Sequence, residues 1–192
     1  MSDSRVIVGV LGIQGDIEKH LTALEQLGAR GRRVLSPAHL SGLHALILPG
    51  GESTTISKGL IRHELVKPIQ EFAESGRAVL GTCAGAILMS REAHNHPVPT
   101  LGLVDVESER NAYGTQLDSF VAPADPDSAA GFAGLTCVFI RAPRLSAIGA
   151  RVEVLVRVDG EPVLVRDGSC FACTFHPELT DDLRVHQALL DA

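Results

Sequence analysis

Aromatic side chains are scarce in this sequence. They account for 4% of its 192 residues, with one Tyr and no Trp, and no run of basic residues is present. A hydrophobic core must therefore be built mainly from Val, Leu, Ile and Ala, and a platform of stacked aromatics for nucleic-acid bases is excluded. The formal net charge of −6 argues further against nucleic acid as the main partner.

Long apolar runs are also absent. No stretch approaches the roughly 20 apolar residues that a membrane-spanning helix needs, so no membrane partner is expected. Residues 1–5 are polar and lead directly into a short apolar run, whereas a secretory signal peptide has a longer apolar core. We expect a soluble, cytoplasmic protein whose length suits a single domain over residues 1–192.

Cysteine is sparse, and four residues are too few for a disulfide scaffold in a chain of this length. Cys170 and Cys173 have the C-x-x-C spacing of redox and zinc pairs. They lie in a segment with a strand pattern, where a separation of three residues places two side chains on opposite faces. Because no second pair with zinc spacing accompanies them, we interpret both as packing residues.

The histidines outside any motif are not expected to bind a metal, and no metal site is predicted. His94 and His96 lie in a polar segment before a proline, and we interpret them as solvated loop residues. His20 and His63 are interpreted as surface residues.

Strand and helix patterns alternate in the first half of the chain. Apolar runs predict strands at residues 6–11, 33–35, 46–48 and 78–81, and helical spacing predicts helices at residues 16–28, from about 53, at 66–75 and at 84–91. The hydroxyls of Ser53, Thr54 and Thr55 suit the N-cap of the second helix. Such alternation is typical of β-α-β units with parallel strands.

Strand patterns follow one another closely in the second half. They cover residues 101–107, 116–121, 136–140, 152–158, 162–165 and 170–175, and a last helix is expected at 181–190. Asp159-Gly160 and Asp167-Gly168 predict hairpin turns, and residues 122–134 predict a loop. The chain therefore predicts a three-layer α/β/α sandwich with a mostly parallel central sheet and additional antiparallel strands.

Gly81-Thr82-Cys83-Ala84-Gly85 is the sharpest local motif. A buried strand ends in it and a helix follows, as in the nucleophile elbow of hydrolases. Small residues on both sides of the nucleophile relieve the tight turn, the helix N-terminus favours a thiolate, and the N–H of Ala84 can face a developing oxyanion. Taken alone, the motif fits a structural cysteine between packing glycines equally well.

A base for this thiol is available in Phe175-His176-Pro177-Glu178. Pro177 keeps His176 out of the α region, and in an extended backbone residues two apart project to the same side. Glu178 can therefore contact the His176 ring, fix its tautomer and stabilise the imidazolium. The alternative, a solvated histidine in a turn before a helix-initiating glutamate, is less favoured because the cysteine elbow is also present.

Leu48 to Thr55 forms a third motif, in which a buried strand ends in Pro-Gly-Gly ahead of a helix. Its backbone N–H groups can bind a phosphate, an oxyanion or an amino-acid head group, although a plain strand-to-helix turn has the same pattern. The motif lacks the lysine and the spacing of a P-loop. Because parallel sheets bind ligands beyond the carboxyl ends of their strands, this loop and Cys83 are expected to share one cleft.

Together these motifs resemble those of the class I, triad-type glutamine amidotransferases. More narrowly, the chain is similar to the glutaminase subunits of pyridoxal 5'-phosphate synthase. The narrower resemblance is carried by residues 9–15, 48–55, 81–85, 107–111, 138–143 and 175–180, which include the strings Gly-Glu-Ser-Thr-Thr, Glu-Arg-Asn and Phe-Ile-Arg-Ala-Pro. It covers nearly the whole chain, and the sequence departs from the family pattern mainly at residues 93–99 and 122–134.

The resemblance implies hydrolysis of L-glutamine to L-glutamate and ammonia, without a cofactor. Cys83 would attack the amide, His176 would transfer the proton and Glu178 would orient His176, and water would then cleave a glutamyl thioester. The resemblance also implies an oxyanion hole at the backbone of Gly51 and Ala84, and glutamine-binding residues Gly51, Glu52, Ser53, Arg110, Ile140 and Arg141. From the residues alone, Arg110 and Arg141 would be ordinary surface residues.

The resemblance also implies a partner. Nothing in the sequence suggests a site for an acceptor substrate, and free ammonia is largely protonated at neutral pH, so a synthase subunit that takes the ammonia directly is expected. In the family this synthase is a (β/α)₈ barrel that makes pyridoxal phosphate from ribose 5-phosphate and glyceraldehyde 3-phosphate, in an assembly of twelve synthase and twelve glutaminase subunits. The helix at residues 16–28, with Glu18 and Glu25 at exposed positions, is our candidate docking surface.

Three alternatives remain open. A glutaminase subunit of another amidotransferase would have the same triad and a different partner. A Cys-dependent hydrolase of another class, such as a peptidase or a deglycase-like protein, would be indifferent to glutamine. A non-enzymatic interaction module with a degenerate triad is the least favoured, because Cys83, His176 and Glu178 are all present.

Overall fold

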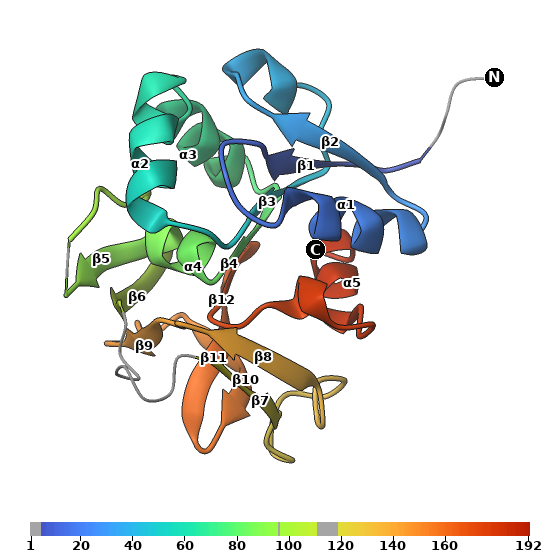
Figure 1. Cartoon of the computed structure of the whole chain (residues 1–192), viewed down its shortest axis with the longest axis vertical. Helices are drawn as coiled ribbons and strands as arrows, with labels where there is room; N and C mark the ends of the chain where they lie inside the picture. The colour runs from blue at the N-terminus through green and yellow to red at the C-terminus, as the bar shows by residue number, and fades with distance from the viewer. Residues whose placement is uncertain (1–4, 96, 111–118) are drawn as a thin grey trace.

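A seven-stranded sheet runs through the centre of the molecule (Figure 1). The computed structural model describes residues 5–95, 97–110 and 119–192. Within these residues the strand order is β10-β11-β12-β4-β3-β1-β2. The strands are β1 (Ile7–Leu11), β2 (Arg30–Val34), β3 (Ala45–Leu48), β4 (Ala78–Thr82), β10 (Glu153–Val158), β11 (Glu161–Asp167) and β12 (Cys170–Cys173).

The strands from β12 to β2 are parallel, and β10 and β11 are antiparallel to their neighbours. Every residue of β3, β4 and β12 is buried. Strands covered on both faces need apolar side chains at successive positions, which is why these segments are continuous apolar runs rather than alternating ones. The predicted mostly parallel sheet with added antiparallel strands is confirmed.

Helices cover both faces of this sheet (Figure 1). One layer contains α1 (Ile17–Gln26) and α5 (Arg184–Leu190), and the other contains α2 (Ser53–Arg62), α3 (Val66–Glu74) and α4 (Ala84–Met89). Val8 and Val10 pack in the same apolar cluster as Leu24 of α1, whereas Leu46 packs in a second cluster with Ile69 of α3. The three-layer arrangement is therefore also confirmed. Among the described residues, no helix has the length and apolar character to cross a membrane.

The hairpin turn predicted at Asp159-Gly160 is confirmed, whereas the one predicted at Asp167-Gly168 lies one residue later, because Asp167 ends β11 and pairs with Cys170. Asp159 and Gly160 connect β10 to β11 with φ angles of 51° and 78°, the left-handed values that a two-residue hairpin turn requires. Gly168, with a φ angle of 59°, lies in the turn between β11 and β12. Cys170 and Cys173 pack in opposite layers of the core, as their strand spacing predicts.

Two smaller sheets accompany the central one. The first has the order β5-β6-β9 and consists of β5 (Ser90–His94), β6 (Val104–Glu109) and β9 (Arg144–Ser146). The second pairs β7 (Ser119–Pro123) with β8 (Thr136–Ile140). The sequence did not predict β5 or β9, and residues 116–118 of the strand predicted at 116–121 lie outside the described residues.

The predicted helix at 84–91 is too long, because α4 ends at Met89 and the chain continues as β5. The hydroxyl of Ser90 donates to the carbonyl of Ile87 at 2.7 Å, and Ser90 then pairs with Val104 of β6. This hydrogen bond satisfies a carbonyl at the helix end, and the chain continues from Ser90 as a strand.

Other boundaries also differ from the sequence predictions: β6 (Val104–Glu109) is displaced from the predicted 101–107, β12 ends at Cys173 and α5 begins at Arg184. β2 begins at Arg30, earlier than the apolar pattern indicates, because its first residues are charged or small. The predicted loop at 122–134 is shorter, since residues 122 and 123 belong to β7. Glu52 lies at the N-cap of α2, where its side chain makes no capping hydrogen bond in the described structure, so the predicted cap at Ser53 is wrong.

Gly85 is the position at which α4 lies closest to the sheet. A Cβ on Gly85 would lie 1.9 Å from the carbonyl oxygen of Leu48, a backbone atom that cannot rotate away. Gly85→Ala is therefore expected to lower the free energy of unfolding by about 3 kcal/mol, measured by urea denaturation. Gly76→Ala is the control, because Gly76 has a φ angle of 84° but open space around it, and it should cost only about 1 kcal/mol. Equal losses in the two variants would show that close packing at Gly85 is unimportant.

Candidate active site

Cys83 lies at the turn between β4 and α4. Its backbone has φ 49° and ψ −103°, a strained conformation for a residue with a side chain. The two neighbouring glycines make this turn possible, since a Cβ on Gly81 would lie 2.6 Å from the backbone of Gly85. Close packing of β4 against α4 therefore holds the thiol at the carboxyl edge of the sheet.

His176 follows β12, the strand next to β4, and its backbone N–H donates to the carbonyl of Val138 at 2.8 Å. Nδ1 of its ring lies 2.7 Å from Oε1 of Glu178, and both side chains are buried. The expected extended backbone is wrong, because Pro177–Leu179 form a turn of 3₁₀ helix (η2) that brings Glu178 back to the imidazole. Since Nδ1–H donates to the carboxylate, Nε2 is the nitrogen that can exchange a proton with a thiol.

The thiol and the imidazole meet beside Gly50. A Cβ built on Gly50 would lie 2.6 Å from Cε1 of His176 and 3.4 Å from Cβ of Cys83. Both side chains also line the same cavity. The absence of a side chain at Gly50 therefore makes the space in which the two groups come together.

Electrostatics favour a charged His176. Burial lowers the pKa of His176, but interactions with Cys83 and Glu178 outweigh this effect and raise the pKa to about 10. A protonated imidazole stabilises negative charge on a neighbouring sulfur. The other thiols have no such partner: burial raises the pKa of Cys137 and of Cys170 to about 12, and that of Cys173 well above its usual range. Cys83 is therefore the thiol suited to nucleophilic attack.

Gly50 and Gly51 form the loop that follows β3, and this loop is anchored at both ends. The N–H of Gly50 donates to Oγ1 of Thr82 at 3.1 Å, and the N–H of Glu52 donates to Oε1 of Gln14 at 3.1 Å. Gly51, between the two anchors, has a φ angle of 150°, which glycine adopts more readily than any other residue. The loop thus presents the Gly51 backbone on the same edge of the sheet as Cys83.

A cavity of about 180 Å³ opens at this edge. Its lining residues are Asp16, Gly51, Glu52, Ser53, Cys83, Ala84, Ile87, Arg110, Ile140, Arg141 and His176. The structure therefore brings together all of the site residues named from the sequence except Glu178, which contacts His176 from behind.

Charged groups of both signs lie around the cavity. Nη2 of Arg141 is 3.1 Å from Oε1 of Glu52, and Nη1 of Arg110 donates to Oγ1 of Thr54 at 3.4 Å. The carbonyl of Ile140 accepts the thiol hydrogen of Cys83 at 3.8 Å. The carboxylates of Asp16 and Glu52 and two guanidinium groups line the cavity beside the nucleophile, and they are complementary to a ligand that carries both an ammonium and a carboxylate.

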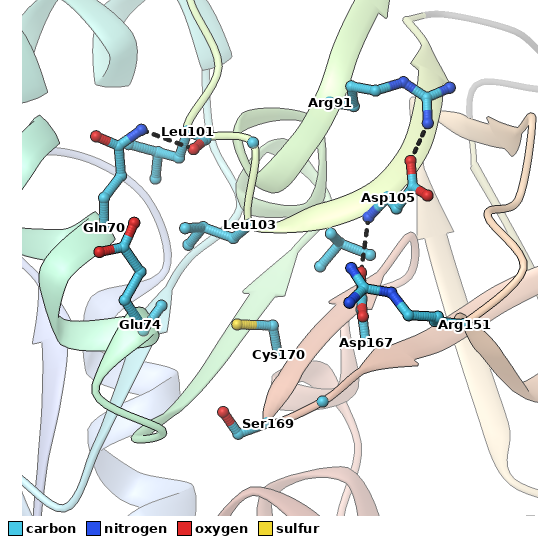
Figure 2. Close-up of a pocket in the computed structure, with 14 residues that line it drawn as sticks. Gln70, Glu74, Arg91, Leu101, Leu103, Asp105, Arg151, Asp167, Ser169 and Cys170 are labelled. Carbon is cyan, nitrogen blue, oxygen red and sulfur yellow. Dashed lines mark hydrogen bonds and ion pairs between the residues drawn. The ribbon is translucent and has the colours of Figure 1, made fainter.

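A larger cavity of about 600 Å³ lies at the amino-terminal end of β12, where Ser169 and Cys170 line it (Figure 2). Cys170 lines it at the first residue of β12, together with polar side chains such as Glu74, Arg91 and Asp167. Burial and the charge of Asp167 raise the pKa of Cys170 to about 12, so this thiol is a poor nucleophile. No histidine is among the described residues that line the cavity. Its size does not make it the reactive site, because its thiol is not activated and no imidazole lies beside that thiol among the described lining residues.

Within the part of the chain that the structure describes, two clusters have ligand atoms close enough together to share a metal ion. They are Asp16, His176 and Glu178, and Glu92, His94 and Glu107. In the second cluster Nε2 of His94 lies 2.9 Å from Oε2 of Glu107, and Glu107 also pairs with Arg91. A guanidinium at this position competes with a metal cation, so we assign no metal to it. The interpretation of His94 as a solvated loop residue is wrong, because it ends β5 and is half-buried, while His96 lies outside the described residues.

Comparison with known proteins shows which chemistry this site belongs to. Residues 10–192 match the SNO glutamine amidotransferase family. The chain belongs to this family. The predicted resemblance to glutamine amidotransferases is therefore confirmed.

Relatives within this amidotransferase family share much of the sequence. The pyridoxal 5'-phosphate synthase subunit PdxT of Shouchella clausii is 45% identical over 183 residues, which cover 95% of this chain and 93% of the relative. PdxT of Thermotoga maritima is 44% identical, with 96% and 97% covered, and PdxT of Thermus thermophilus is 44% identical, with 97% of each covered.

Solved amidotransferase structures have the same fold. A crystal structure of a glutamine amidotransferase, 44% identical, superimposes with a TM-score of 0.90 over 96% of this chain and 97% of that one. PurLQS from Thermotoga maritima, at 18% identity, superimposes with a TM-score of 0.67 over 97% of this chain and 98% of that one, and this likeness shows the fold alone.

Sequence analysis missed several residues around the site. Asp16 and Ile87 line the cavity, and Gln14 and Thr82 anchor the loop before Glu52. A polar residue just after a parallel strand, such as Gln14, could have been recognised from the rule that ligands bind at carboxyl ends.

The interpretation of His20 as a surface residue is wrong, because its exposed fraction is 0%. Its spacing shows why: Ile17, His20 and Leu24 follow one another at intervals of three and four, which places them on the same helix face. His63, in contrast, is exposed as expected.

An added methyl group at Gly50 tests the meeting of the two reactive side chains. Gly50→Ala would place a carbon 2.6 Å from Cε1 of His176 and displace the ring. We expect kcat for glutamine hydrolysis to fall by about 100-fold, because small displacements of catalytic groups have effects of this size. Gly12→Ala is the control, since its Cβ would contact only Leu35 and neighbouring backbone, at 3.2 Å or more, and should leave kcat unchanged. Unchanged kcat in Gly50→Ala would contradict the assigned geometry.

Proposed function

We propose that this chain is the glutaminase subunit of a pyridoxal 5'-phosphate synthase, with residues 1–192 acting as one glutamine amidotransferase domain. It hydrolyses L-glutamine to L-glutamate and supplies the ammonia to a synthase subunit in vitamin B6 biosynthesis. The proposal is carried by one observation: Cys83 and His176, the latter paired with the buried Glu178, line a cavity in a member of a glutamine amidotransferase family. Full-length similarity to PdxT subunits supports the choice of pathway.

The first half of the reaction forms a thioester. Nε2 of His176 holds the proton from the thiol, as its raised pKa favours, and the thiolate sulfur of Cys83 attacks the side-chain amide carbon of glutamine. The amide oxygen becomes an oxyanion, which the backbone N–H groups of Gly51 and Ala84 stabilise. His176 then gives the proton to the amide nitrogen, the carbon–nitrogen bond breaks, and ammonia leaves.

The second half releases glutamate. Water attacks the thioester carbon while Nε2 of His176 takes one of its protons, and the same two N–H groups stabilise the second oxyanion. The carbon–sulfur bond then breaks, and the proton on His176 returns to the sulfur. Throughout both halves Glu178 accepts a hydrogen bond from Nδ1 and stabilises the positive charge on the ring.

Charged groups at the cavity orient the substrate. The α-ammonium of glutamine is complementary to Glu52, and its α-carboxylate is complementary to the guanidinium groups of Arg110 and Arg141. Ser53 and the backbone of Gly51 and Ile140 complete the binding site. Substrate binding replaces the resting ion pair between Glu52 and Arg141 with contacts to the two charged groups of the amino acid.

The partner synthase receives the ammonia before it is protonated by solvent. We propose that the outer face of α1 is the docking surface, because Glu18 and Glu25 are exposed there and the preceding residue Asp16 lines the cavity. We also propose the family assembly of twelve synthase and twelve glutaminase subunits.

A glutaminase assay with and without the synthase subunit tests this function. We expect slow glutamate formation by the isolated chain and a marked increase when the synthase is added. Cys83→Ala should lower the rate in the complex by about 10⁴-fold or more, because removal of a nucleophile leaves only the effects of binding and the oxyanion hole.

Cys170→Ala is the matched control, because it removes a buried thiol that the mechanism does not use, and it should retain wild-type kcat. Full activity in Cys83→Ala would exclude the proposed nucleophile. A wild-type rate that does not respond to the synthase would exclude the proposed coupling.

A further inference from the structure

Two buried histidines lie behind the triad, on the side of Glu178 that faces away from His176. His20 of α1 and His186 of α5 each have an exposed fraction of 0%. Nδ1 of His20 is 2.9 Å from Nε2 of His186, and Nε2 of His20 is 3.6 Å from Oε2 of Glu178. Among the described residues, no hydrogen bond reaches that carboxylate oxygen. The second oxygen of the triad carboxylate therefore faces an imidazole and little else.

Both histidines are neutral, so each carries one N–H. Burial, together with the neighbouring His186 and His176, holds the pKa of His20 well below its ordinary value. Burial alone lowers the pKa of His186 to about 4. Either a ring N–H or a ring lone pair of His20 therefore faces the Glu178 carboxylate. The tautomer of His20 determines which of the two it is.

The surroundings select one arrangement of these protons. If His20 carried its proton on Nδ1, its Nε2 lone pair would face the Glu178 carboxylate, and the Nδ1–H of His186 would be a buried donor without an acceptor. If His20 carries its proton on Nε2, this N–H faces the carboxylate and Nδ1 accepts a hydrogen bond from Nε2–H of His186. Nδ1 of His186 is then an acceptor without a hydrogen-bond partner among the described residues, which is less costly than a buried donor without an acceptor.

His20 also connects the triad to the loop at Gly50. Nε2 of His20 lies 3.3 Å from Oγ1 of Thr82, and the same oxygen accepts the N–H of Gly50. Thr82 immediately precedes Cys83. One imidazole therefore contacts both the carboxylate that orients the base and the hydroxyl that anchors the Gly50–Gly51 loop.

We propose that His20 is a positioning residue for the triad: in its Nε2–H tautomer, held by His186, it directs an N–H toward Oε2 of Glu178 and keeps the carboxylate aligned with His176. This inference rests on the proposed function of the triad. His20 touches neither the nucleophile nor the cavity. Its loss is therefore expected to lower kcat through His176 and to leave glutamine binding unchanged.

Two substitutions separate alignment from packing. His20→Asn keeps a polar group near the position of Nδ1 and removes the donor that faces Glu178. His20→Gln keeps an amide N–H near the position of Nε2. We expect His20→Asn to lower kcat about tenfold, because the buried Glu178 carboxylate loses the N–H that faces its second oxygen, with KM changed by less than about twofold. His20→Gln should recover most of the lost kcat, and the exposed control His63→Asn should match the wild type.

Melting temperatures of all variants are measured beside the kinetics, in the complex with the synthase. Wild-type kcat in a folded His20→Asn variant would overturn the proposal. Equal losses of kcat in His20→Asn and His20→Gln at equal melting temperature would overturn it as well, because a purely structural role would give this result. Failure of the wild type to hydrolyse glutamine would instead contradict the proposed function.

A measurement on the unmodified chain does not depend on activity. Nitrogen-15 NMR of the histidine rings distinguishes the two neutral tautomers, and the His20 signals are assigned by their absence in His20→Gln. We expect the Nε2–H tautomer for His20 at pH 7. The Nδ1–H tautomer would overturn the proposal, because a lone pair would then face Glu178.

Discussion

The buried hydrogen bond between Nδ1 of His176 and Oε1 of Glu178 is the interaction on which the rest of the site depends. It fixes which ring nitrogen carries the proton, and so leaves Nε2 to exchange a proton with the thiol. It also provides a partner for a carboxylate that is otherwise expensive to bury. With Cys83 on its other side, His176 carries positive charge most easily where the reaction needs it.

This interaction can work only because the sheet brings distant segments to one edge. Gln14 follows β1, Gly50 follows β3, Cys83 follows β4 and His176 follows β12, so each lies beyond the carboxyl end of a parallel strand. Hydrogen bonds then join these segments in pairs, from Gly50 to Thr82 and from Glu52 to Gln14. The reactive side chains are thus held by backbone that the central sheet makes rigid.

The inner face of α1 contributes to this arrangement, and its outer face is the docking surface proposed for the synthase. His20 lies on the buried side, against Glu178 and His186, while Glu18 and Glu25 lie on the exposed side. A helix with these two faces gives a direct physical route by which contact with another subunit can reach the triad.

The parts of the fold and the site that the sequence could predict are those encoded by local pattern. Continuous apolar runs identify β3, β4 and β12, and the glycines around Cys83 identify the tight turn. β9 has only three residues and no readable period, and the end of α4 depends on one hydroxyl, so neither could be found in this way. The burial of His20 depends on packing between α1, η2 and α5, which cannot be predicted from any one segment. Its spacing from Ile17 and Leu24 on the helix nevertheless indicated the buried face.

The ion pair between Arg141 and Glu52 could not be predicted from the sequence either. These residues are separated by 89 positions, and they meet only because β8 and the loop after β3 border the same cavity. The motifs named both residues through family resemblance, but their mutual contact is a property of the folded chain.

The most direct measurement on the reaction is identification of the atom that becomes acylated. The complex is mixed with glutamine, quenched rapidly in acid and digested, and the peptides are analysed by mass spectrometry. A glutamyl group on the peptide that contains Cys83, absent in Gly50→Ala or strongly reduced there, is the expected result. A glutamyl group on Cys137, Cys170 or Cys173, or steady glutamate release without any acylated peptide, would contradict a mechanism in which His176 and Glu178 activate Cys83.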